Sequence, residues 1–225
     1  MPNWPAAVLC TSGLAAEARI ARAAGFSVVV GAGDRERTPS LVERAALGAS
    51  CLVSFGIAGA LAPHLRPGDV VVSAEVVAAA HRWRGEEGFR RRLAELAQGL
   101  GAVEGPVLGA PAILATEADK RRAWQETGAL AVDLESDVVA DIAARDGIPF
   151  LVVRAIADAV YRELPPAALI PLSLNGRPRL PSVFASVLRQ PRQITPLLAL
   201  ARETRRALAA LAEPARALHG LVAAA

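Results

Sequence analysis

The chain has 225 residues, of which 53% are hydrophobic and 21% are charged, so it can bury the core of one globular domain over residues 1–225. Its net charge of +3 comes almost entirely from arginines spread along the chain, which argues against a nucleic-acid partner. The sequence shows no secretory leader, no apolar run of the roughly 18 residues that a membrane span needs, and no spaced histidines for a metal site. We therefore expect a cytoplasmic protein without a metal or organic cofactor.

Apolar, β-branched runs alternate with amphipathic segments over the first 160 residues. This alternation predicts an α/β fold: one three-layer domain with a central, mostly parallel or mixed sheet flanked by helices. Ligands of such folds bind beyond the carboxyl ends of the strands, so polar residues there are the first candidates for chemistry. The predicted strands are 6–11, 26–31, 49–55, 69–77, 111–116, 129–134 and 150–156, and the predicted helices are 14–24, 39–48, 86–99, 117–127 and 135–145.

The C-terminal region, residues 161–225, differs from the rest. Residues 161–182 are rich in proline and predict a loop, and a helix from about 193 to 213 follows. Apolar residues at helical spacing from Ile194 to Leu211, with Arg202 among the polar positions, fit a helix that packs on the domain. They also fit a basic amphipathic helix that rests on anionic lipid.

The first two strand ends of interest are rich in glycine. In "CTSGLAAEARIA" (10–21), a Ser12-Gly13 turn precedes a helix with Glu17 in its first turn. Such a turn can receive an anion on free amides, although Glu17 also simply suits the positive end of a helix. In "SFGIAGALAPHLRPGDVVVS" (54–73), Gly56 lets the backbone approach a ligand, or it lets a helix pack closely on the sheet.

The other two strand ends carry acids. In "ALAVDLESDVVADIA" (129–143), a strand ends in Asp133, Leu134 and Glu135, residues that would also start the next helix. In "LVVRAIADAVY" (151–161), Arg154 lies inside an apolar strand and Asp158 lies just past its end. A buried strand that delivers a carboxylate to its tip indicates chemistry at that tip.

Taken in order, "GLAAEA", "SFGIAGALAPHLRPGDVVVS", "AVDLES" and "VVRAIADA" resemble the purine nucleoside phosphorylase superfamily, most closely its methylthioadenosine/S-adenosylhomocysteine nucleosidase branch. The resemblance covers roughly residues 6–160, and residues 163–208 look like the C-terminal region of the hopanoid-associated phosphorylases. It implies an enzyme that releases adenine from a 5′-substituted adenosine, adenosylhopane above all, with phosphate as the acceptor. Water as the nucleophile, as in the nucleosidases, is the alternative. The resemblance also implies a homodimer and a lipid-linked substrate, hence contact with the inner membrane.

The same resemblance implies roles for individual residues. Asp158 would protonate N7 of the departing adenine, Glu135 would bind the ribose hydroxyls beside Leu134, and Glu17 would position the attacking water. If phosphate is the nucleophile, backbone amides at the two glycine turns and an arginine side chain would bind it. The remaining substrate-binding residues are Ile57 and Ile113, and the phosphate candidates are Ser12, Gly13, Gly56, Arg19 and Arg154.

Four positions depart from the family pattern. Ala157 stands where a serine would orient Asp158, Ile57 replaces a serine near the nucleophile, and Ala112 replaces an aromatic residue against adenine. Val160 stands where the pattern has its second acid. These changes keep open a module that binds nucleosides without cleaving them. Such a module needs no proton donor beside the base, so the retained acids favour an enzyme.

Overall fold

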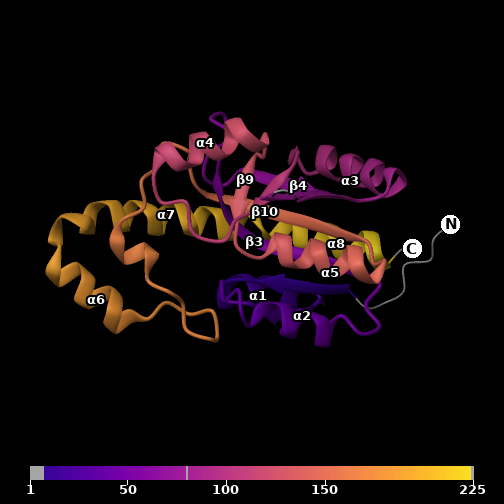
Figure 1. The fold of residues 1–225 in the computed structure, drawn as a ribbon, viewed down its shortest axis with the longest axis horizontal. Helices are drawn as coiled ribbons and strands as arrows, with labels where there is room; N and C mark the ends of the chain where they lie inside the picture. The colour runs from indigo at the N-terminus through magenta and orange to yellow at the C-terminus, as the bar shows by residue number, and fades with distance from the viewer. Residues whose placement is uncertain (1–7, 80, 224–225) are drawn as a thin grey trace.

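The computed structural model describes residues 8–79 and 81–223, in which helices cover both faces of one mixed sheet (Figure 1). The strands within that part of the chain are β1 (Val8–Ser12), β2 (Ser27–Val30), β3 (Cys51–Ala60), β4 (Val70–Ser73), β5 (Glu75–Ala78), β6 (His81–Arg84), β7 (Val103–Glu104), β8 (Val107–Gly109), β9 (Ala131–Asp133) and β10 (Phe150–Asp158). The helices are α1 (Ala15–Ala23), α2 (Thr38–Ala45), α3 (Glu87–Gly99), α4 (Glu117–Thr127), α5 (Ser136–Asp146), α6 (Leu180–Arg189), α7 (Ile194–Ala210) and α8 (Ala212–Ala223), with 3₁₀ turns η1 (Pro166–Leu169) and η2 (Pro191–Gln193).

The centre of the sheet is β3, which pairs in parallel with β1 and β10 and in antiparallel fashion with β9. The other edge of β10 pairs with β4 in antiparallel fashion, so the sheet is mixed. One core cluster joins the sheet to α1, α3, α7 and α8, and a second joins it to α2 and α5. The expected three-layer α/β fold is confirmed, and the carboxyl ends of β1, β3 and β10 meet at one edge.

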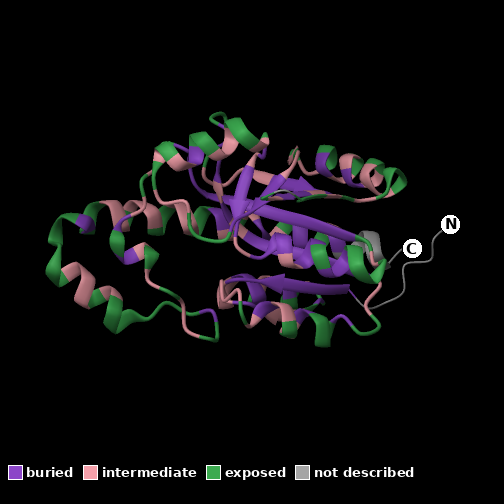
Figure 2. Cartoon of the chain, in the orientation of Figure 1, coloured by how far each residue is buried: buried purple, intermediate pink, exposed green. Residues whose placement is uncertain are grey.

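Burial follows this layering (Figure 2). Every residue of β10 is buried, whereas none of α6 is. Both cysteines are free and buried within β1 and β3. No helix in the described residues has the length and hydropathy to cross a bilayer.

One strand prediction was wrong, and another was right except for a break within it. Residues 111–116 form a loop between β8 and α4, which ends where the Thr116 hydroxyl accepts a hydrogen bond from the Asp119 amide and caps α4 (3.1 Å). Residues 69–77 form two strands, β4 and β5, with a break at Ala74, where the Ser73 hydroxyl accepts a hydrogen bond from the Glu75 amide (2.9 Å). Both sites show a short polar side chain bonding to nearby backbone, which an apolar run does not reveal.

The C-terminal region contains more helix than predicted. The expected loop over residues 161–182 includes η1 and the start of α6, and the expected helix over 193–213 is α7 followed by a separate α8. The second half of α7 packs on β10 with Ala207 buried, while Ile194 and Leu198 near its start are exposed. The end of this helix therefore joins the core, through Ala207 and the partly buried Leu208 and Ala210.

Candidate active site

Asp158 lies where β10 makes a bulge against β3. The register runs regularly to Ile156, which pairs with Ala58, and then Asp158 pairs with Gly59, so Ala157 is the extra residue. A bulge of this kind turns the following side chain in a new direction. A side chain on Gly59 would place its Cβ 3.2 Å from Asp158 Oδ2, so the glycine leaves room for the acid.

Lys120, at the end of the first turn of α4, holds Asp158. Its ammonium donates a short hydrogen bond to Asp158 Oδ2 and further bonds to the carbonyls of Arg162 (2.8 Å) and Ala159 (3.3 Å). All three ammonium protons are thus used, and the lysine is 1% exposed. Burial raises the pKa of the Asp158 carboxyl, while the charge of Lys120 opposes that rise. The serine expected at position 157 is therefore replaced in space by a lysine from another element.

Glu17 is fixed between α1 and β3. Its two carboxylate oxygens accept hydrogen bonds from the amides of Ile57 (2.8 Å) and Leu14 (2.7 Å). A Cβ on Gly56 would come within 2.6 Å of both Glu17 and Arg154, so this strand position must be glycine. Burial raises the pKa of Glu17, and Arg154 and the amides pull it back down.

Glu135 lies at the start of α5 and belongs to a buried charge network. Its Oε1 accepts from the Gly33 amide (3.1 Å), and its Oε2 is 3.8 Å from Arg154 Nη2. Arg154 also pairs with Asp133 at 2.7 Å and donates to the Ser54 hydroxyl at 2.5 Å. Burial raises the pKa of Glu135 to about 7, with Arg154 lowering it and the neighbouring acids raising it.

Arg35, in the loop between β2 and α2, binds Asp137 and so fixes the same region from outside the cavity; we call this ion pair the Arg35–Asp137 latch. Arg35 forms a bidentate pair with Asp137 (2.5 and 3.1 Å) and donates to the carbonyls of Ala110 (3.1 Å) and Leu134 (3.4 Å). A planar guanidinium suits such a forked contact. Arg35 therefore ties the first turn of α5 to two strand ends.

The three acids converge on one cavity of about 420 Å³. Its polar floor comes from the ends of β1, β3, β9 and β10. An apolar wall faces that floor and comes from the chain after β10. The wall is formed by Leu164, Ala168, Leu169, Ile170, Pro171 and Leu172.

Most residues predicted for the site reach this cavity. Its lining includes Glu17, Glu135, Asp158, Gly13, Ile57, Leu134 and Ile113. Ser12, Gly56 and Arg154 lie beneath the floor, where Ser12 Oγ is buried without a hydrogen-bond partner among the described residues. Arg19 is outside: it is exposed on α1 and lines a different cavity, so the structure does not bring it to the site.

Sequence reasoning missed Lys120, Asp133 as the partner of Arg154, and the Arg35–Asp137 latch. Lys120 carried a signal, because it is the only lysine in a chain that otherwise uses arginine. In the described residues, no group of three His, Cys, Asp or Glu side chains is placed to hold a metal ion.

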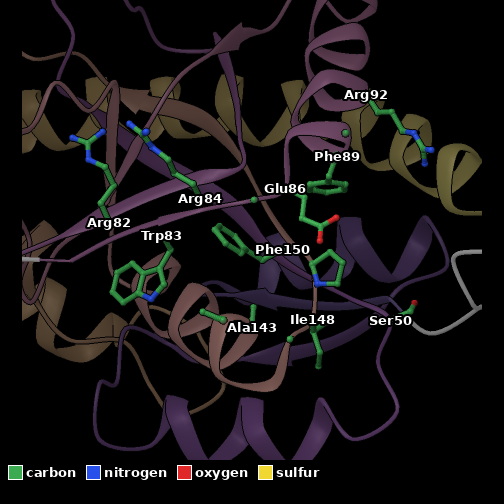
Figure 3. A pocket seen from close by; sticks show the side chains of 15 residues that line it. Ser50, Arg82, Trp83, Arg84, Glu86, Phe89, Arg92, Ala143, Ile148 and Phe150 are labelled. Carbon is green, nitrogen blue, oxygen red and sulfur yellow. The ribbon is translucent and has the colours of Figure 1, made fainter. Parts of the chain in front are cut away.

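A larger cavity of about 640 Å³ lies elsewhere (Figure 3). Phe150 in its lining begins β10, whereas Asp158 ends that strand, about 26 Å away at the usual rise per residue. Trp83 and Phe89 line it with several arginines, and no residue predicted for the site lies there. Its size does not make it the reaction site, because the buried acids gather at the other end of the strand.

A family model described as the phosphorylase superfamily matches residues 7–167. The chain belongs to the phosphorylase superfamily. This confirms the resemblance drawn from the four motifs and, with it, an enzyme of the nucleoside phosphorylase and nucleosidase class. No curated protein matches the chain in sequence.

Solved structures of this superfamily share the fold at low identity. An S-adenosylhomocysteine nucleosidase from Streptococcus pyogenes, in complex with 5-methylthiotubericidin, is 16% identical with a TM-score of 0.67, over 98% of each chain. A 5′-methylthioadenosine/S-adenosylhomocysteine nucleosidase from Helicobacter pylori is 14% identical with a TM-score of 0.64, over 97% of this chain and 99% of that chain. The futalosine hydrolase of the same organism is 17% identical with a TM-score of 0.55, over 88% and 98%.

Proposed function

We propose that this superfamily member cleaves the N-ribosidic bond of a 5′-substituted adenosine and releases adenine. The observation that carries the proposal is the convergence of three buried acids, Asp158, Glu135 and Glu17, on one cavity, each held by different partners. A site that only bound nucleosides would have no use for a carboxyl kept protonatable by burial.

Asp158 is the general acid in this mechanism. Lys120 holds Oδ2, which leaves Oδ1 to carry a proton to N7 of the base. Protonation at N7 makes adenine a better leaving group as the ribosyl carbon becomes cationic. Lys120 acts through Asp158 as a positioning residue, and its charge limits how far burial raises the pKa of the acid.

Glu135 binds the sugar. One carboxylate accepts hydrogen bonds from the vicinal 2′- and 3′-hydroxyls and so fixes the ribose while its anomeric carbon reacts. A side chain on Gly13 would place its Cβ 2.7 Å from Glu135 Oε1, so the glycine turn gives this carboxylate its room. Leu134, which lines the cavity beside it, is the apolar contact for the sugar.

The contacts of Glu17 favour water over phosphate. The amides of Leu14 and Ile57 that an anion would need are already used by this carboxylate, whose own charge repels phosphate. Arg154 is likewise engaged with acids beneath the floor. Phosphorolysis, the expectation drawn from the subfamily, is therefore the alternative to hydrolysis in this proposal, and the homodimer stays a prediction.

The apolar wall supports an apolar group on the 5′ carbon. Leu169 and Ile113 line the cavity and are partly exposed, so a hydrophobic substituent could continue from the sugar along the wall. This is the property by which adenosylhopane would be chosen over hydrophilic nucleosides.

Adenine release by the purified chain tests the proposal. Methylthioadenosine, S-adenosylhomocysteine and adenosylhopane are compared with and without phosphate, and the sugar product is identified. We expect phosphate-independent release, a free sugar product and a preference for the apolar substrate. Asp158→Asn should lower kcat by about 10² to 10⁴. Binding of nucleosides without release from any of them would establish the binding module instead, and formation of a sugar 1-phosphate would establish phosphorolysis.

A further inference from the structure

Helix α6 presents its apolar side to the outside. Leu180, Phe184 and Leu188, spaced four residues apart on one stripe, are 71%, 65% and 66% exposed. The opposite side faces η1 and η2 with small and polar groups: Ser186 accepts two hydrogen bonds from Gln193 Nε2, at 2.8 and 3.0 Å. Helices that pack on a core do the reverse. We call Leu180, Phe184 and Leu188 the α6 ridge.

The segment that carries the ridge is basic throughout. Residues 164–202 contain no aspartate or glutamate, although acids are frequent in the rest of the chain. In Figure 1 this segment leaves the main body as an extended arm before α7 returns to it. Its positive charges are Arg177, Arg179, Arg189, Arg192 and Arg202.

The chain segment just before the α6 ridge lines a basic cavity. This cavity measures about 600 Å³, is lined by Arg19, Arg22, Arg37 and Arg177, and has no acid in its lining. Arg37 donates to the carbonyl of Leu174 (2.9 Å), which fixes the arm over this cavity. Arg177 lines the cavity only three residues before the ridge begins. Apolar and basic groups thus follow one another directly along the arm.

We propose that the α6 ridge and its flanking arginines dock the protein on an anionic lipid surface. The ridge would enter the boundary between headgroups and acyl chains, and the arginines would contact lipid phosphates. A second copy of the chain fits less well, because a symmetric contact through this arm would place arginines against arginines.

Docking also positions the active-site cavity. Residues 164–172 form its wall and belong to the same arm, so the cavity faces the segment that meets the lipid. This second consequence rests on the proposed function: an adenosine with an apolar 5′ group would pass from the bilayer along the wall. Lipid docking itself does not depend on the reaction.

Vesicle co-sedimentation tests the docking. We expect binding to vesicles of phosphatidylcholine with phosphatidylglycerol, weakening with salt, and none to phosphatidylcholine alone. Phe184→Ser with Leu188→Ser should weaken binding more than tenfold, and Arg179→Gln with Arg189→Gln about 25-fold. Leu47→Ser, which removes an exposed leucine elsewhere, and Arg44→Gln with Arg91→Gln are matched controls that should bind as the unmodified protein does.

Two further measurements separate this proposal from others. The ridge variant should release adenine from methylthioadenosine at the rate of the unmodified protein. If the unmodified protein releases adenine from no nucleoside, the proposed function is refuted and lipid docking is not. Sedimentation velocity reports oligomeric state. If the ridge variant converts a dimer to a monomer without a change in lipid binding, or if the unmodified protein ignores anionic vesicles at low salt, docking is refuted.

Discussion

Replacement of Lys120 by methionine removes the ammonium from Asp158 and leaves a side chain of similar length. The acid is 7% exposed, so once unpaired it must either stay charged in a buried place or take up a proton. Loss of one partner of a buried pair typically costs about 3–5 kcal/mol. Protonation of Asp158 limits that cost. The free energy of protonating an aspartate is about 1.36 kcal/mol for each pH unit above its ordinary pKa, which gives about 4 kcal/mol at pH 7 and about 1.5 kcal/mol at pH 5.

The stability of the Lys120→Met variant depends on pH. The variant's Asp158 has a folded pKa raised further above its unfolded value, so the variant loses stability as pH rises above that unfolded value. We expect the difference in unfolding free energy between Lys120→Met and the unmodified protein to shrink from pH 7 to pH 5, as measured by urea denaturation.

Enzyme kinetics distinguish a Lys120 that positions Asp158 for catalysis from a Lys120 that only stabilises the fold. We expect kcat to fall about 10²-fold because the acid is no longer held in place. The alkaline limb of kcat should also move to higher pH, because an acid without a neighbouring cation keeps its proton longer. Initial rates of adenine release from a soluble nucleoside measure both.

The control is Arg121→Met, which removes a cation from the same helix. Arg121 makes an exposed i,i+4 pair with Glu117, so its loss should cost less than about 1 kcal/mol and leave the pH profile unmoved. Lys120→Met with Asp158→Asn, which removes both buried charges, should regain stability but not activity. A folded Lys120→Met protein with kcat within about threefold of normal and an unmoved limb would refute the reasoning.

Three other predictions concern Glu135, Gly56 and Arg35. Because burial raises the pKa of Glu135 to about 7, the nucleoside KM should rise as pH falls through that value, and Glu135→Gln should have a high KM without this dependence; a flat profile in the unmodified enzyme would contradict the role. Gly56→Ala should lose about 1–3 kcal/mol in urea denaturation, since its Cβ would lie 2.6 Å from Arg154, and unchanged stability would mean the strand moves freely. Arg35→Ala should raise KM about tenfold with little change in kcat, because it breaks the Arg35–Asp137 latch and so loosens the start of α5 beside Glu135. An equal loss in kcat would place Arg35 in the chemical step.

The strand ends could be predicted because each is a local pattern. Asp158 and Glu135 each follow an apolar run, which marks them as residues at strand ends. β10 carries Asp158 to the carboxyl edge that it shares with β1 and β3, whereas β9 runs antiparallel to β3 and pairs with its last residues, so Glu135 reaches the same cavity from a strand of opposite direction. Glu17 is found in the same way, from a glycine turn followed by a helix. Proximity in space follows here from the topology of an α/β sheet.

Lys120 could not be placed by such reasoning. It lies in a charged helix between the partly exposed Asp119 and the exposed Arg121, and nothing in that spacing marks it as buried. Its contact with Asp158 depends on how α4 packs against the end of β10. The direction of the α6 ridge is unpredictable for the same reason, because periodicity identifies an apolar stripe but not what the stripe faces.

The wall of the active-site cavity has an evolutionary consequence. The superfamily match ends at residue 167, so the catalytic acids lie inside it and wall residues Leu169 and Leu172 lie outside it. Under the proposed function, the catalytic acids and most of the wall that selects the 5′ group therefore lie in separate stretches of the sequence. On that proposal, a lineage can exchange the arm, and with it the admitted substrate, while the strand ends that carry the acids stay as they are.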